Sequence, residues 1–116
     1  MDRRKVSDFL MKHNCPSAYN GYEELVDLVC EGYKYFGRLA QNLKTVYHDI
    51  AKMHETTRLC LERNLRTLVK AWAKTAEFQK IFTSLPTNAE LVIKIIEQIN
   101  KEKRREEYSI YDILLA

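Results

Sequence analysis

Residues 47–72 contain two stretches with helical periodicity and a short polar turn between them, and this arrangement constrains the fold more than any other feature of the chain. Leu61, Leu65, Leu68 and Trp72 recur at the spacing of an α-helix with one buried face. Arg and Lys side chains occupy other faces of the same predicted helix. A helix of this kind, held at an angle by the helix before it, is the element that enters the major groove of DNA.

The composition is typical of one small, soluble, α-helical domain. The chain has 116 residues, of which 46% are hydrophobic and 30% charged, and only three Gly and two Pro interrupt it. We expect no membrane segment and no export signal, because no apolar run of the required length is present. The net charge of +3 does not by itself imply that the protein binds nucleic acid. That inference has to rest on the positions of the basic residues.

Periodicity and capping patterns predict an all-α helix bundle of about six helices that contains a helix-turn-helix. Ser7 is expected to cap the first helix and Thr56 or Thr57 the fourth, while Thr87 and Glu90 form a predicted capping box at the last. The expected ranges are 7–13, 21–36, 39–54, 57–75 and 77–82, followed by a long helix that begins near residue 87.

Individual polar residues are also assigned to an environment. Glu23, Glu24 and Glu31 are expected on the solvent-exposed side of the second helix. Gly37 is expected to interrupt the helical structure after that helix. His54, in the turn of the helix-turn-helix, is expected to be exposed to solvent, and the alternative is a contact with DNA phosphate. Cys15, Cys30 and Cys60 are predicted to be free thiols, because they are odd in number and widely spaced.

The C-terminus differs in composition from the rest of the chain. We therefore divide the chain into a helix-turn-helix domain at 1–100 and a charged linker with an apolar tail at 101–116. The tail, Y-S-I-Y-D-I-L-L-A, is too apolar to remain exposed. It is expected to fold back on the domain's own core, and the alternative is docking on another subunit or on a protein partner.

Several motifs resemble one known family when they are taken in order. The motifs are Pro16, Gly21-Tyr22, L-K-T-V-Y-H-D-I-A-K at 43–52, Thr56-Thr57, Glu62-Arg63, Arg66 and P-T-N-A-E at 86–90. Together they resemble the C-terminal effector domain of the stage zero sporulation protein A family, a response regulator of sporulation, over residues 8–100. The resemblance implies a bacterial, cytoplasmic regulator of transcription that binds double-stranded DNA through its helix-turn-helix.

The resemblance also implies roles for individual residues. Glu62 and Arg63 match a Glu-Arg pair of the family, so Arg63 is expected to read a guanine and Glu62 to accept from a cytosine amine or to orient an Arg. Arg66 matches a second family Arg and is expected to contact phosphate, as are the free N–H groups at Asn88 and Ala89. The predicted DNA-contacting residues are Lys52, Thr56, Thr57, Arg58, Cys60, Glu62, Arg63, Arg66, Thr67, Lys70 and Asn88.

The chain departs from the family pattern in the first turn of the recognition helix. Leu59 and Cys60 stand where the family has Ser and Arg, and Thr67 stands where it has His. The absence of a base-reading Arg removes about 1–3 kcal/mol of discrimination, which Arg58 can replace only in part. We expect the sequence preference to have changed more than binding itself. Cys60 is interpreted as a neutral replacement, with a redox switch as the alternative.

Other classes of function find little support in the sequence. No nucleophile–base pattern and no Gly-rich phosphate loop is present, so an enzyme is not expected, and neither a cofactor nor a metal site is predicted. The sequence begins almost at the effector-like region, so phosphorylation in the family's manner is not expected if the chain is complete; whether a receiver domain was removed or never present is left open. A homodimer on repeated sites is plausible, since one helix reads few base pairs. The alternative function is a protein-binding adaptor or antagonist on the same fold that does not bind DNA.

Overall fold

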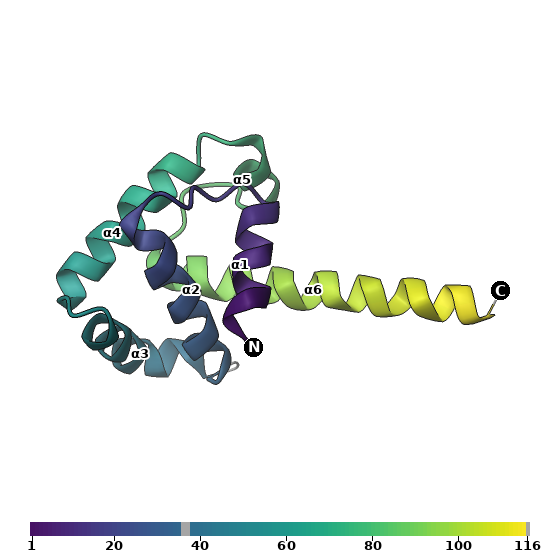
Figure 1. The fold of residues 1–116 in the computed structure, drawn as a ribbon, viewed down its shortest axis with the longest axis horizontal. Helices are drawn as coiled ribbons and strands as arrows, with labels where there is room; N and C mark the ends of the chain where they lie inside the picture. The colour runs from purple at the N-terminus through teal and green to yellow at the C-terminus, as the bar shows by residue number, and fades with distance from the viewer. Residues whose placement is uncertain (36–37, 116) are drawn as a thin grey trace.

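The structure, a computed structural model, describes residues 1–35 and 38–115, and it leaves the side chains of Ala40 and of residues 106–115 undescribed. The described residues form helices and no strands, which confirms the predicted all-α bundle. The helices are α1 (Arg3–Lys12), α2 (Asn20–Tyr33), α3 (Leu39–Met53), α4 (Arg58–Trp72), α5 (Ala76–Ile81) and α6 (Asn88–Leu115). Figure 1 shows a bundle from which the C-terminal half of α6 projects.

Helix α1 begins earlier than the sequence pattern predicted. Asp2 is its N-cap, and the Asp2 carboxylate accepts a hydrogen bond from the Lys5 N–H at 2.9 Å. Ser7 therefore does not cap the helix, and that prediction was wrong. Ser7 lies within α1, and its hydroxyl is 2.9 Å from the hydroxyl of Tyr22 on α2. The helix ends before Asn14, which has a positive φ of 61°.

Helix α2 is the central element, because it contacts α1, α3, α4 and α6. A helix with four neighbours leaves few positions at the surface, so residues on several of its faces are buried. Glu23 is exposed as predicted, but Glu24 is only 5% exposed, so the prediction for Glu24 was wrong. The predicted break at Gly37 lies outside the described residues.

An aromatic cluster closes the bundle at the end of α4. Trp72 is fully buried, and its ring meets Phe78 and Phe82 edge to face, with centroids 5.2 and 5.9 Å apart. Such aromatic pairs add stability beyond their buried area. The indole N–H of Trp72 donates to the carbonyl of His13 at 2.8 Å, so the ends of α1 and α4 are held together.

Helix α6 combines a packed half with a projecting half. At its start the Glu90 N–H donates to Thr87 Oγ1 at 3.2 Å, and the Thr87 hydroxyl donates to the Glu90 carboxylate at 3.0 Å. The bond from the Glu90 N–H to the Thr87 hydroxyl is one of the two bonds of the predicted capping box. The other recorded bond joins the two side chains, whereas the prediction had the Glu90 carboxylate accept from the backbone N–H of Thr87. Farther along α6, a carboxylate oxygen of Glu102 lies 2.8 Å from His13 Nε2 at the end of α1.

Residues 101–115, which we expected to form a linker and a tail, continue α6 as helix. Their Lys, Glu, Arg and Leu residues are strong helix formers, and no Gly or Pro interrupts them. The backbone of this segment leads away from the bundle (Figure 1). The side chains of residues 106–115, on which both hypotheses for the apolar tail depend, lie outside the described residues.

Candidate nucleic-acid interface

A sharp turn joins α3 to α4 and sets the angle between them. The Thr56 N–H donates to the carbonyl of Ala51 at 2.9 Å, and the Glu55 N–H donates to the carbonyl of Lys52 at 3.2 Å. Glu55 has a φ of 53°, the left-handed conformation that this helix-ending motif requires. These bonds satisfy the last carbonyls of α3 and turn the chain directly into α4.

Thr57 is the N-cap of α4, as predicted. Its Oγ1 accepts a hydrogen bond from the Cys60 N–H at 3.1 Å. A side-chain cap of this kind stabilises a helix by about 1 kcal/mol because it satisfies an otherwise unpaired donor. One face of α4 packs on the bundle through Leu61, Leu65, Leu68, Val69 and Trp72. The opposite face is therefore left open to solvent.

Basic side chains line this open face of α4. Arg63, Arg66 and Lys70 are exposed and lie three and four residues apart, so they form one stripe along the helix. Within the described part of the chain, no salt bridge involves any of the three. Their charges are therefore available to a ligand. Lys52, at the end of α3, is exposed as well.

Three predicted contact residues, Arg58, Glu62 and Thr67, make side-chain hydrogen bonds within α4. Glu62 accepts a hydrogen bond from Arg58 Nε at 3.1 Å, so this carboxylate orients an Arg in the unbound structure. The Thr67 hydroxyl donates to the carbonyl of Arg63, one turn earlier, at 3.1 Å. Leu59, in the first turn of α4, is 72% exposed.

The structure brings three predicted contact residues together from distant parts of the sequence. Arg66 and Lys70 of α4 border a small cleft of about 20 Å³, and Asn88, the first residue of α6, borders the same cleft. The N-terminus of a helix carries free N–H groups and a partial positive charge. Two cationic side chains beside such a helix end form a region of positive potential.

Cys60 occupies the first turn of α4. The hydroxyls of Thr57 and Thr56, together with the nearby charge of Arg63, lower the pKa of its thiol below the ordinary value. Cys15, by contrast, is buried, and desolvation raises its pKa to about 12. The structure records Cys15, Cys30 and Cys60 as free cysteines, in agreement with the sequence prediction.

A set of polar residues holds the helix-turn-helix on the side that faces α2, and the sequence did not predict this role. His54 is half-buried, and its Nε2 lies 2.7 Å from a carboxylate oxygen of Asp27 on α2, so the prediction of solvent exposure was wrong. Arg3 of α1 pairs with the same Asp27. Asn64 of α4 donates to the carboxylate of Glu24 at 2.8 Å. Only the burial of Glu24 and Asp27 reveals this role, and burial depends on packing.

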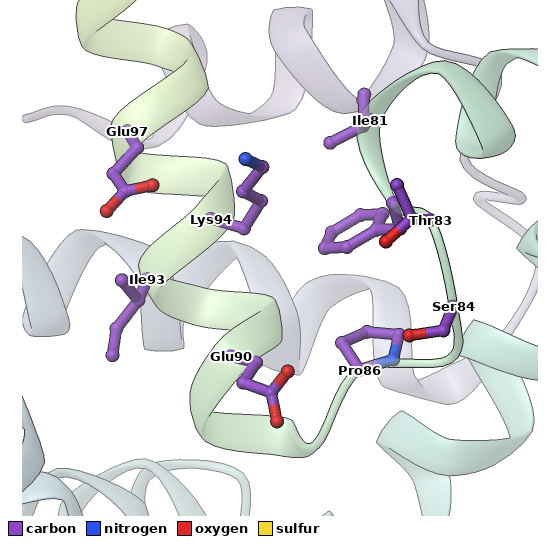
Figure 2. Close-up of a pocket in the computed structure, with 9 residues that line it drawn as sticks. Ile81, Thr83, Ser84, Pro86, Glu90, Ile93, Lys94 and Glu97 are labelled. Atoms are coloured by element: carbon purple, nitrogen blue, oxygen red, sulfur yellow. The ribbon is translucent and has the colours of Figure 1, made fainter.

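A groove of about 330 Å³ lies between α6 and the loop that follows α5. Figure 2 shows Glu90, Lys94 and Glu97 of α6 on one side and Ser84 and Pro86 of the loop on the other. Two carboxylates and one amine do not attract phosphate. The groove therefore does not continue the basic stripe of α4.

The described residues define a helix-turn-helix domain whose recognition helix, α4, presents a basic face. The sequence also matches the model of one protein family, described as "Sporulation initiation factor Spo0A C terminal", over residues 6–99. The chain belongs to this family of helical DNA-binding effector domains. No curated protein matches the chain. None of the helices in the described residues is long and apolar enough to cross a membrane.

Proposed function

We propose that the protein is a sequence-specific regulator of transcription that binds double-stranded DNA in the bacterial cytoplasm. The observation that carries this proposal is the exposed stripe of Arg63, Arg66 and Lys70 on α4, because none of these cations has a salt-bridge partner among the described residues. Specific recognition needs both base-edge and phosphate contacts. The family supplies the general role, and the open face of α4 supplies the groups for both kinds of contact.

The first two turns of α4 are the part proposed to enter the major groove. Arg63 reads a guanine through its two parallel donors. Glu62 holds Arg58 in place, so Arg58 supplies part of the base reading that Leu59 and Cys60 cannot provide. Thr56, Thr57 and Lys52 approach the sugar–phosphate backbone from the turn, while Thr67 and Cys60 flank the reading residues.

A second contact to the backbone is proposed at the far end of α4. Arg66, Lys70 and the N–H groups at Asn88 border one cleft and bind one phosphate between them. Because this clamp lies beyond the reading residues, it fixes the register of α4 along the duplex. Two copies on repeated sites would raise specificity, since one recognition helix covers few base pairs.

A second candidate function follows from Leu59. This side chain is 72% exposed in the turn of α4 that would first meet DNA, where a large apolar group finds no hydrogen-bond partner on phosphate. A protein-binding adaptor or antagonist that uses this turn, or the projecting half of α6, is the alternative.

Fluorescence anisotropy separates the two candidates. A labelled duplex carrying a sporulation box and a scrambled duplex are titrated with wild-type protein and with Arg63→Ala, in salt from about 50 to 200 mM. Arg104→Ala is the matched control, because Arg104 is also an exposed Arg but lies on α6, beyond the contact of Glu102 with α1. We expect Arg63→Ala to lose about 1–3 kcal/mol of selectivity and Arg104→Ala to lose none.

Replacing Arg66 tests the phosphate clamp. Arg66→Ala is expected to weaken binding to both duplexes about equally and to reduce the slope of log affinity against log salt by about 1. A steep salt dependence without selectivity for the sporulation box would mean a DNA-binding protein with a different operator. No binding of wild-type protein to either duplex at low salt would reject the proposal and favour the protein-binding alternative.

A further inference from the structure

Glu24 is a buried carboxylate at the contact between α2 and the recognition helix. It is 5% exposed, and its Oε1 accepts a hydrogen bond from Asn64 Nδ2 at 2.8 Å. Its other oxygen, Oε2, is also buried and has no hydrogen-bond partner among the described protein atoms. Burial raises the pKa of Glu24, while the Asn64 hydrogen bond and the nearby His54 act in the opposite direction.

Such a carboxylate is a poor source of stability. Removing a charged group from water costs more than one hydrogen bond returns, and an unsatisfied oxygen adds to that cost. Apolar residues of similar volume often replace buried charged groups without loss of stability. The Glu24–Asn64 bond instead restricts the orientation of α4 relative to α2, because a hydrogen bond tolerates only a narrow range of distances and angles.

A second contact from α2 reaches the same residue of α4. Gly21 lies one turn before Glu24, and a Cβ atom at Gly21 would lie 2.5 Å from the carbonyl oxygen of Asn64. The two helices therefore touch backbone to backbone at this point. Gly21 sets how closely α4 approaches α2, and Glu24 limits how far α4 can rotate about its own axis.

Rotation of α4 matters because Asn64 is adjacent to Arg63 and two residues before Arg66. A helix with its side chains has a radius of about 5–6 Å, so a rotation of about 10° moves a side chain by about 1 Å. A displacement of that size disrupts the paired contact of an Arg with one guanine. It changes phosphate contacts less, since these carry no sequence information.

We propose that Glu24 and Asn64 are positioning residues that set the rotation of the recognition helix on α2 and thereby the base selectivity of duplex binding. This role rests on the proposed DNA-binding function. Neither side chain needs to touch DNA. The pair limits the directions in which Arg63 can point, and it does so with a contact that contributes little to folding.

The test measures stability and selectivity on the same variants of the full chain. Glu24→Met removes the carboxylate at similar volume, and Glu24→Gln keeps an amide oxygen that accepts from Asn64. Urea unfolding gives stability, and anisotropy gives the ratio of affinities for the duplex that wild-type protein prefers and for a scrambled duplex. We expect Glu24→Met to be at least as stable as wild type but about tenfold less selective, and Glu24→Gln to retain selectivity.

The outcomes separate the positioning role from a structural one. If Glu24→Met retains the wild-type ratio, or loses stability and affinity for both duplexes in parallel, the positioning role is rejected while DNA binding stands. If Glu24→Met does not fold, Asn64→Ala removes the same bond from a half-exposed site and must show the loss of selectivity instead. If wild-type protein binds no duplex, the proposed function and the positioning role are both rejected.

Discussion

Replacing Gly21 with Ala is expected to destabilise the protein, although the same change elsewhere in a helix usually stabilises it. The new Cβ would lie 2.5 Å from the Asn64 carbonyl oxygen and 2.9 Å from the Asn64 carbonyl carbon. Ordinary contact begins at 3.4 Å, so α2 and α4 must separate by about 0.9 Å. Both atoms belong to the backbone of α4, and no flexible side chain can move aside.

The magnitude follows from two opposing terms. Ala is favoured over Gly inside a helix by about 1 kcal/mol. Overpacking a well-packed contact costs about 1–3 kcal/mol, and a clash with backbone lies at the upper end of that range. We therefore expect Gly21→Ala to lower the free energy of unfolding by about 2 kcal/mol.

Gly32 provides a matched control within the same helix. A Cβ at Gly32 would lie 3.2 Å from Val92 Cγ1 and 3.3 Å from Leu39 Cδ1, which are side-chain atoms that need to move only slightly. Gly32→Ala is therefore expected to be neutral or to stabilise by up to about 1 kcal/mol.

Urea unfolding followed by circular dichroism measures both variants, with the m-value as a check on two-state behaviour. The reasoning is refuted if Gly21→Ala is as stable as Gly32→Ala, because the close approach of α2 and α4 would then not exist in solution. A small effect of Gly21→Ala with a changed m-value would instead indicate an altered unfolded state.

Three further predictions use single groups of the structure. Glu55→Gly is expected to raise the free energy of unfolding by about 0.5–1 kcal/mol, because Gly adopts a positive φ without steric strain; thermal unfolding checks this, and a lower midpoint would contradict it. Iodoacetamide at about pH 8 is expected to alkylate Cys60 well before the buried Cys15, as followed by mass spectrometry of the native protein, since thiolate is the reactive form; equal rates would contradict the two pKa shifts. Burial raises the pKa of Glu24 above its ordinary value of 4.5, so the folded state binds this proton more tightly than the unfolded chain. The free energy of unfolding therefore falls as the pH rises from the unfolded-state pKa through the higher folded-state pKa. The stability of Glu24→Gln relative to wild type should therefore increase as the pH rises above 4.5, and a constant difference would reject the shift.

The fourth helix and its cap could be predicted from residues that lie close in sequence. Leu61, Leu65 and Leu68 recur with helical period, and Thr57 precedes them at the position where a hydroxyl satisfies a free N–H. Both signals act over a few residues and survive in almost any tertiary context. The same logic failed for Ser7, because Asp2 offers an equivalent cap five residues earlier.

The environment of Glu24 and His54 could not be predicted in this way. A Glu on an amphipathic helix is usually exposed, and the pattern around Glu24 contains nothing unusual. Its burial results from the position of α2 among four other helices. His54 is half-buried because the turn of the helix-turn-helix lies against Asp27 of α2.

The sequence by itself determined the all-α class, the fourth helix with its Thr57 cap, the turn at residues 54–57 and the basic character of one face of α4, because period, caps and charge are local properties. The motifs also identified the family, since their order along the chain is a property of the sequence alone. Only the tertiary structure decided that Asn88 lies beside Arg66 and Lys70, and that Glu24 and Gly21 meet Asn64. These contacts join residues that are 18 or more positions apart, and they depend on the angles at which helices pack, which no short stretch of sequence specifies.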